Sequence, residues 1–559
     1  MPDHDLVVRG GTVVDGTGAP ARAADVAVDH GRVSAVGEVA GRGREEIDAD
    51  GLLVTPGWVD VHTHYDGQAT WDELLTPSSW QGVTTVVMGN CGVGFAPVRP
   101  DRHEWLIALM EGVEDIPGTA LSEGISWGWE SFPEYLDVLE TRRYAIDVAS
   151  QVPHAALRGY VMGDRGADHE EVPTADEIAT MGRLAAEAID AGALGFTTSR
   201  TVAHRSADGR HTPSLTSTAD ELLGIARAIG ETGKGVFEVV ADLVDLDGEF
   251  ALIRAMAEVS SRPLSLTTLQ RPECAPGEYR RILGLIEAAV ADGVAMRGQV
   301  AARPVGLIMR LDGRVHPLVM SPTYQGLASL PLPALAAELR RPEVRDKILA
   351  ELTAPGANVL ARFGTAFALG NPPRYDQRPE TALDLAAAYD VLLEDDGHGA
   401  VYVPVMNFVD GDFAATREML LHPLTVPGLG DAGAHCTMIC DGSFPTYLLQ
   451  YWARDADPAQ RVPVEWVVKR QCADTAALVG LHDRGVLAPG RRADVNVVDF
   501  DALAIGAPEM LHDLPAGGKR LVQRATGYRA TIVAGAVVMR DGEPTGARPG
   551  RLVRGARPA

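Results

Sequence analysis

Residues 56–64 read PGWVDVHTH, a short valine-rich run that begins after a Pro-Gly pair and ends in two histidines. On a strand, alternate residues share a face, so His62 and His64 are expected to point the same way. Two imidazoles on one face can hold a divalent metal, although two strand histidines with ordinary hydrogen bonds are the alternative. The stretch therefore predicts a strand at 57–62 that ends at a metal site.

Further apolar runs follow this strand and alternate with helical patterns. Strands are expected at 83–89, 144–152, 193–199, 235–240, 262–269, 294–300 and 428–433. Residues 174–192 and 218–233 each begin with an N-cap threonine, continue with acids and close on glycine, as helices do. Eight strands that alternate with helices predict an α/β fold with a (β/α)₈ TIM-like barrel.

The two ends of the chain carry a different pattern, in which valine-rich alternation is broken by Gly, Asp or Pro. This pattern predicts a small β-sandwich built from 1–57 plus 484–559, with the barrel at 58–483. A long interval separates the last two barrel strands. We expect an insertion at about 302–426 that acts as a lid or substrate-binding subdomain over the C-terminal face of the barrel.

Composition limits the classes of function. A net charge of −26 disfavours nucleic acid and anionic membrane surfaces, and no run is apolar enough to span a bilayer. Five cysteines are an odd number in a long chain, which favours a reducing compartment and thus the cytoplasm. A carboxylated lysine has few candidates, because the only lysines are Lys234, Lys347, Lys469 and Lys519.

Several ordered motifs resemble the amidohydrolase superfamily, and more narrowly its N-acyl-D-amino-acid deacylase (D-aminoacylase) branch. They are DLVVRGGTVVDGTG (5–18), GLLVTPGWVDVHTHYDGQATWD (51–72), VVMGNCGVGFAP (86–97), GALGFTTS (192–199), SFPTYLLQYWARD (443–455) and LHDRGVLAPGRRADVNVVDFD (481–501). The resemblance spans nearly the whole chain and implies a metal-dependent barrel with a β-sandwich formed by both ends.

The resemblance also implies roles for two residues. Cys91 matches the cysteine that replaces the carboxylated lysine in this branch, and a thiolate binds zinc strongly and can bridge two ions. Asp431 matches the aspartate of strand eight, which touches the metal and moves a proton from the attacking water to the leaving nitrogen. A structural buried cysteine and an aspartate that satisfies local turn amides are the alternatives.

The sequence departs from the family at two strands. The family carries a metal-binding histidine on strand five, and on strand six another histidine followed by a lysine that faces the substrate carboxylate. Here Glu238 stands near the first position, and Thr267, Thr268 and Gln270 occupy the second. Glu238 needs a partner in an apolar strand, either a metal or an arginine such as Arg297 or Arg303.

Four residues are candidates for substrate contacts. Arg297 and Arg303 could bind an anionic group where the lost lysine would have acted, or could instead balance Glu238. His154 resembles a histidine of the family's turn after strand three, and His435 lies four residues after Asp431. The alternative for His154 is a buried histidine with ordinary hydrogen bonds, and the alternative for His435 is a polar loop residue without a role in binding.

The predicted activity is metal-dependent hydrolysis of a small-molecule amide, with metal-hydroxide attack and Asp431 as proton shuttle. By resemblance the substrate is an N-acyl-D-amino acid and the cofactor is one zinc ion, while a second ion and other divalent metals stay open. A cyclic or aryl amide is one alternative, and a catalytically degenerate ligand-binding member is another. We expect no nucleic-acid or membrane partner, and a homo-oligomer remains an option.

Overall fold

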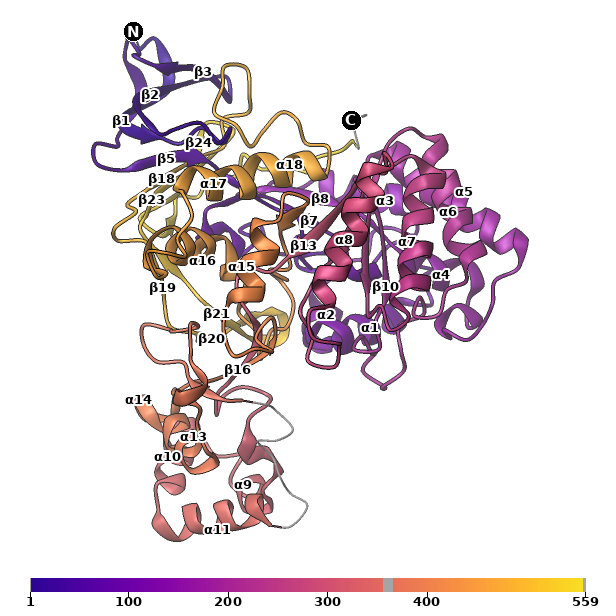
Figure 1. Ribbon diagram of the computed structural model, residues 1–559, viewed down its shortest axis with the longest axis vertical. Helices are drawn as coiled ribbons and strands as arrows, with labels where there is room; N and C mark the ends of the chain where they lie inside the picture. The colour runs from indigo at the N-terminus through magenta and orange to yellow at the C-terminus, as the bar shows by residue number, and fades with distance from the viewer. Residues whose placement is uncertain (1, 355–364, 556–559) are drawn as a thin grey trace.

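The computed structural model describes residues 2–354 and 365–555. Residues 1 and 556–559 of the predicted sandwich and 355–364 of the predicted insertion lie outside this part. Figure 1 shows a β-rich region where strands from the N-terminal and C-terminal parts of the chain lie together, a central region of strands covered by helices, and a helical lobe at the bottom of the view. Among the described residues, no helix has the length and apolar character needed to cross a bilayer.

A nine-stranded sheet combines the two ends of the chain. It contains β1 (His4–Val13), β2 (Arg22–Asp29), β3 (Arg32–Gly37), β4 (Gly43–Asp48), β5 (Leu53–Pro56), β18 (Val495–Val498), β23 (Tyr528–Val533), β24 (Ala536–Arg540) and β25 (Glu543–Pro544). Its order is β25-β24-β23-β18-β5-β1-β2-β3, with β4 on β1. The ends join where β5 pairs antiparallel with β18, and alternating valines supply a shared core.

The central strands form two parallel sheets. One contains β6 (Trp58–Asp60), β7 (Val83–Met88) and β8 (Asp147–Ser150); the other contains β9 (Val152–Pro153), β10 (Gly195–Arg200), β11 (Val236–Ala241), β12 (Leu264–Thr267), β13 (Met296–Val300) and β17 (Thr425–Pro427). Every predicted central strand except the last coincides with one of these. The short apolar runs therefore predicted the strands correctly, because strands buried on both faces are continuously apolar.

The two parallel sheets approach each other at both pairs of edges. One pair of edges is β8 and β9, which are separated in sequence by Gln151 alone. Gln151 N donates to Met88 O at the end of β7 at 2.9 Å, and Leu194 N, just before β10, donates to Ser150 O at the end of β8 at 2.8 Å. At the other edges, Thr63 forms a parallel bridge with Ala432, and His64 N donates to Ala432 O at 2.9 Å. The segments after β6 and after β17 are thus held side by side.

The eighth strand lies earlier in the sequence than predicted. We expected it at 428–433, but β17 ends at Pro427 and the following residues have no regular structure apart from the bridge at Ala432. Asp431 has φ +46° and Gly433 has φ +97°, which interrupt an extended strand. Asp431 therefore stands on a loop beyond the strand end.

Helices follow most of the parallel strands and cover their outer faces (Figure 1). They are α1 (His103–Glu114), α2 (Gly118–Gly124), α3 (Phe132–Glu140), α4 (His154–Met162), α5 (Ala175–Ala191), α6 (Ala219–Glu231), α7 (Leu246–Ser260), α8 (Glu278–Ala291), α15 (Ala414–Leu421), α16 (Phe444–Tyr447), α17 (Val464–Lys469) and α18 (Thr475–Leu478). The predicted N-caps are confirmed, since Thr174 accepts from Glu177 N and Thr218 accepts from Glu221 N.

The interval between β13 and β17 contains the lobe at the bottom of Figure 1. It contains β14 (Val305–Met309), α9 (Pro322–Gln325), α10 (Leu332–Leu339), α11 (Pro342–Thr353), β15 (Phe367–Ala368), α13 (Leu385–Leu392), α14 (Glu394–Gly397) and β16 (Val401–Met406). The lobe has a hydrophobic cluster of its own, and β14 and β16 pair antiparallel at its base. This base connects the lobe to the ends of the central strands.

Candidate metal centre

The two histidines of the opening motif lie just beyond β6 and are each 1% exposed. His62 Nδ1 hydrogen-bonds with Gln299 Oε1 at 2.9 Å. Because an amide oxygen only accepts, Nδ1 carries the proton and Nε2 keeps its lone pair. That nitrogen lies 3.3 Å from Cys91 Sγ, so it is free to act as a metal ligand.

Cys91 follows β7 in a tight turn, where it has φ +54°. Few non-glycine residues adopt this conformation, and here it brings the thiol against the histidines. One donor atom each from His62, His64 and Cys91 lies within 4.8 Å of the others, and all three residues are buried. The structure thus brings together three of the residues predicted as metal ligands.

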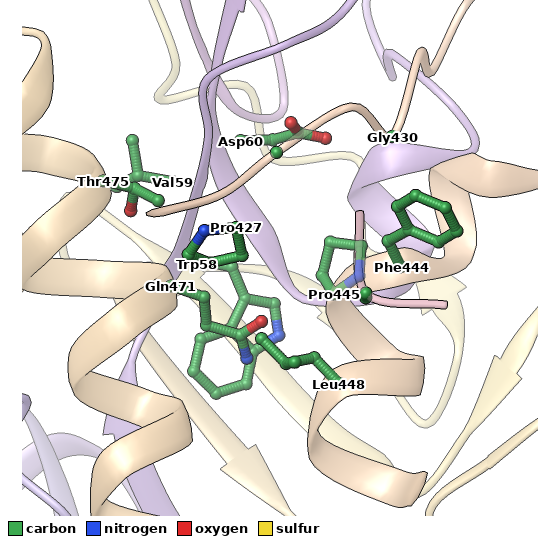
Figure 2. Close-up of a pocket in the computed structure, with 12 residues that line it drawn as sticks. Trp58, Val59, Asp60, Pro427, Gly430, Phe444, Pro445, Leu448, Gln471 and Thr475 are labelled. Carbon is green, nitrogen blue, oxygen red and sulfur yellow. The ribbon is translucent and has the colours of Figure 1, made fainter. Parts of the chain in front are cut away.

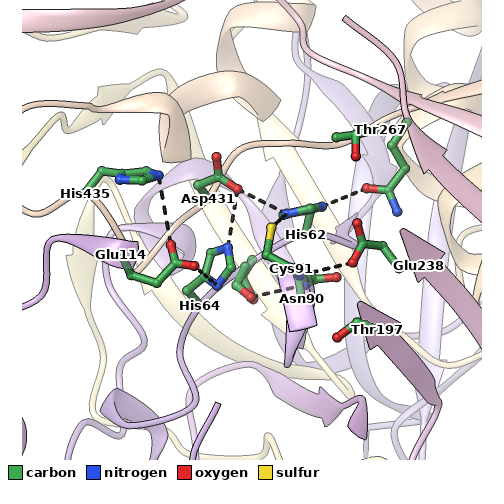
Figure 3. Close-up of polar contacts among 12 residues, drawn as sticks. His62, His64, Asn90, Cys91, Glu114, Thr197, Glu238, Thr267, Asp431 and His435 are labelled. Carbon is green, nitrogen blue, oxygen red and sulfur yellow. Dashed lines mark hydrogen bonds and ion pairs between the residues drawn. The ribbon is translucent and has the colours of Figure 1, made fainter. Parts of the chain in front are cut away.

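Asp431 completes the group from the loop after β17 (Figure 3). Its Oδ1 lies 3.2 Å from His62 Nε2 and 3.5 Å from His64 Nε2. The Asp431 carboxylate therefore faces Nε2 of both His62 and His64. Together with Cys91, these residues come from three separate parts of the chain.

Glu238 lies on β11, is 2% exposed and borders the same group. Its Oε2 accepts a hydrogen bond from Cys91 N at 3.1 Å, and its Oε1 has no partner among the described residues. The structure places neither suggested arginine against it. Arg303 pairs with Asp441 at 2.9 Å, and Arg297 donates to Met296 O.

Burial shifts the ionisation of these acids. It raises the pKa of Asp60 and of Glu238 to about 7 each, and it raises the pKa of the Cys91 thiol well above its usual value. Burial also lowers the pKa of His64 to about 4. For Asp431, burial opposes ionisation, but the facing imidazoles of His64 and His62 hold its pKa below the usual range.

The donor set fits a divalent metal. Among the described residues, the ion pairs of Asp431 are with histidines, and no lysine or arginine pairs with Glu238. Several buried acids that lack a cation are costly to ionise, and a divalent ion supplies the missing positive charge. Imidazole, thiolate and carboxylate are the ligand types that zinc prefers.

Two neighbours of the centre were missed by sequence reasoning. Gln299 on β13 bonds to His62 across 237 positions of sequence. Glu114, the last residue of α1, is 1% exposed and its Oε1 lies 3.4 Å from His64 Nδ1. The sequence did contain a signal for Glu114, because it shares a helix face with the apolar residues Met110 and Val113. An acid on a buried face requires a polar partner.

The four candidate substrate residues are dispersed. His154 is buried with Nδ1 on Thr198 and Nε2 on Glu221, which matches the satisfied core histidine that we left open. His435 lines the cavity beside the metal centre. Arg297 lines a different cavity near the starts of β12 and β13. Arg303 is fully buried, with its guanidinium over the ring of Tyr375.

A cavity of about 270 Å³ opens beside the metal centre. His62, Cys91, Asp431 and His435 line one side, and His204 lies at the same cavity. The remaining wall is mostly apolar: Val113, Val240, Leu243, Leu269, Ile282, Val305, Leu307, Val405, Met406, Leu429 and Ile439. Some of these side chains come from β14 and β16, so the insertion contributes to the wall.

A second cavity, shown in Figure 2, lies against β6 and the residues at the end of β17. It is lined by Trp58, Asp60, Gln471, Phe444 and other residues, and its volume is about 30 Å³. That space is about the size of a water molecule, too small for an acylated amino acid. Of these two cavities, the one beside Cys91 is large enough to receive a small organic substrate.

Comparisons with known proteins agree with the motifs. The sequence model of the amidohydrolase family matches residues 45–539. D-aminoacylase from Alcaligenes xylosoxydans xylosoxydans is 28% identical over 98% of this chain and 97% of its own. N-acyl-D-glutamate deacylase from that organism is also 28% identical, over 98% and 96%.

A solved structure supports the same relationship. N-acyl-D-glutamate deacylase from Bordetella bronchiseptica, complexed with zinc and a phosphonate mimic of the tetrahedral intermediate, has a TM-score of 0.65 to this chain. It is 26% identical and covers 99% of each chain. The resemblance drawn from the sequence motifs is confirmed by these comparisons.

Proposed function

Because the chain belongs to the amidohydrolase family, we propose that it is a zinc-dependent hydrolase that cleaves the amide bond of N-acyl-D-amino acids. The observation that carries the proposal is the meeting of His62, His64 and Cys91 within 4.8 Å, with Asp431 Oδ1 at 3.2 and 3.5 Å from the imidazoles. The N-acyl-D-amino-acid deacylases among the relatives, and the zinc in one of their structures, support the substrate and the metal.

His62, His64, Cys91 and Asp431 would hold the zinc, with Glu238 as a further ligand. Bound zinc supplies a Lewis acid that lowers the pKa of water from 15.7 to about 7. Asp431 is the proton carrier, because its carboxylate is ionised near neutral pH and, among the described residues, pairs with histidines and not with an arginine. Gln299 keeps the His62 ring in the orientation that presents Nε2.

The proposed architecture places this site at the mouth of one (β/α)₈ barrel at 58–483. The contacts at Gln151 and between Thr63 and Ala432 support closure of the two parallel sheets into one ring. The sheet from both ends would be the β-sandwich domain, 1–57 plus 484–559. The insertion at about 302–426 would form part of the substrate site through β14 and β16.

The cavity supports a substrate with one carboxylate and an apolar side chain. Arg271, adjacent to Gln270 where the family carries its lysine, is the only arginine or lysine among the described lining residues. Its Nη1 lies 2.9 Å from Asp242, and two further glutamates lie within 4 Å of its guanidinium. Arg271 would take the α-carboxylate, and no free cation would remain for an acidic side chain.

N-acetyl-D-leucine is therefore expected to be hydrolysed with a kcat/KM at least about 10-fold above that of N-acetyl-D-glutamate. An unpaired second carboxylate among Val240, Leu243 and Met406 would lose its hydration without gaining a partner. Asp242→Asn should reduce the ratio of the two kcat/KM values, because it frees Arg271 from its ion pair. Asp247→Asn on the exposed surface should leave this ratio unchanged. A preference for the glutamate derivative in the wild type would contradict this assignment.

The proposal as a whole is tested by metal analysis together with a substrate screen. Protein purified without chelator should contain about one or two zinc ions per chain and hydrolyse N-acetyl-D-amino acids faster than their L forms. If no Zn, Mn or Fe is bound, the hydrolase assignment fails. Turnover of cyclic amides alone would keep the chemistry but overturn the substrate.

Glu238→Gln separates a metal ligand from a hydrogen-bond acceptor. The amide still accepts from Cys91 N but is a poor zinc ligand, so zinc affinity is expected to fall at least about 10-fold. Competition with a chromogenic chelator measures this, and the exposed Glu231→Gln is the matched control. Unchanged affinity would leave Glu238 only its bond to the Cys91 backbone.

A further inference from the structure

Glu114 is buried beside the metal centre without being one of its clustered donors. It ends α1, whose buried face also carries Leu106, Leu109 and Met110, and its side chain is 2% exposed. A carboxylate in such surroundings is unfavourable unless polar groups face it. The groups that face it belong to the loops of the metal centre.

Figure 3 shows Glu114 between two histidines. Its Oε1 lies 3.4 Å from His64 Nδ1, and its Oε2 lies 3.9 Å from His435 Nε2. The backbone of the same residue accepts a hydrogen bond from His435 N. The end of α1 is thereby tied to the loop that carries Asp431.

The facing atoms of Glu114 and His64 lack other partners. Oε1 of Glu114 and Nδ1 of His64 are both buried and form no hydrogen bond with any described residue. They stand a few tenths of an ångström beyond a hydrogen bond. His64 Nε2 meanwhile points at Asp431, on the side where the other donors converge.

The Nδ1 atoms of the two histidines thus face hydrogen-bond acceptors of different strength. His62 Nδ1 is held by a neutral amide at 2.9 Å, whereas His64 Nδ1 faces a carboxylate. A carboxylate that accepts from the far nitrogen selects the tautomer with a free Nε2 and makes that nitrogen a better ligand.

We propose that Glu114 is a positioning residue that accepts a hydrogen bond from His64 Nδ1 and thereby presents His64 Nε2 to zinc. The inference rests on the proposed function, because it assumes that the centre binds zinc. The same residue is tied to His435, at the wall of the substrate cavity, because its backbone carbonyl accepts from His435 N.

The test compares Glu114→Met with Glu114→Gln. Methionine fills the space and offers only a weak thioether acceptor, so zinc affinity is expected to fall about 10- to 100-fold. Glutamine retains an oxygen that can accept from Nδ1–H, so it should recover part of the loss. Affinity is measured by chelator competition and the thermal midpoint of the metal-free protein is recorded, with Glu104→Gln on the exposed face of α1 as control.

The order wild type, Glu114→Gln, Glu114→Met in zinc affinity supports the proposal. A purely structural residue would lower the midpoint of the metal-free protein and leave the affinity of the folded fraction unchanged, which overturns it. If Glu114→Met does not fold, the affinity of Glu114→Gln decides, and a value equal to the wild type overturns it. Failure of the wild type to bind zinc is a separate result that refutes the proposed function.

Discussion

Asp431→Asn is expected to lower kcat for N-acyl-D-amino acids about 10³-fold while zinc stays bound. Proton transfer by a positioned side chain contributes about 10²- to 10⁴-fold, and the amide that replaces the carboxylate cannot take a proton. Asparagine has nearly the same shape, so the loop at φ +46° should persist, because asparagine tolerates this conformation as well as aspartate does.

Zinc should remain because three other donors stay in place. His62, His64 and Cys91 keep their atoms within 4.8 Å, and only one carboxylate oxygen is lost. Some weakening is still expected, so the kinetics are measured at saturating zinc with metal content determined on the same sample. Asp501→Asn, on the exposed surface, is the matched control and should retain wild-type kcat.

The outcomes distinguish two roles of Asp431. A loss of kcat with metal retained supports a proton carrier. A loss of metal that excess zinc reverses, with kcat restored, would make Asp431 a ligand alone and contradict its catalytic role.

Removing the metal is expected to abolish hydrolysis, and His62→Ala should produce the same loss without a chelator. Nε2 of His62 lies 3.3 Å from Cys91 Sγ and 3.2 Å from Asp431 Oδ1, so this nitrogen is the donor that links the other two. Its deletion should weaken zinc binding more than about 100-fold, beyond the loss expected when only an outer partner of a ligand is removed.

Two measurements check this expectation. Activity lost on chelation should return when zinc is added to the wild type but not at the same zinc concentration to His62→Ala. Zinc at about 100 times its dissociation constant should also stabilise the wild type by about 2.7 kcal/mol, seen as a higher melting temperature. The exposed His398→Ala should behave as wild type, and full activity of the chelated protein would contradict a metal mechanism.

The strand pattern was readable from the sequence because it depends on neighbours along the chain. Apolar runs and capping threonines identified β10, β11, α5 and α6 closely. The prediction for the last strand was wrong because β17 is formed by Thr425–Pro427, just before GLGDAG, whereas positive φ angles at Leu429, Asp431 and Gly433 make that stretch a loop. The loop is the feature that brings Asp431 over the histidines.

The contacts of the arginines could not be predicted from the sequence. Arg297 lies at the start of β13, away from the strand ends that reach the site. Arg303 follows the end of β13, but it packs against aromatic side chains and pairs with Asp441. Arg271, which does line the cavity, was not considered because its relevance depends on Asp242, 29 positions earlier. Pairings of this kind follow from side-chain packing between loops.

The sequence by itself determined the alternation of strands and helices, the shared face of His62 and His64, and the family, because these follow from local periodicity and ordered motifs. The sequence also pointed to Cys91 and Glu238 at the metal, but only the tertiary structure put Glu114 behind His64 and the insertion in the wall of the cavity. The physical reason is that parallel strands bring their carboxyl ends to one edge, where the contacts are decided by how loops and helices from distant parts of the chain pack.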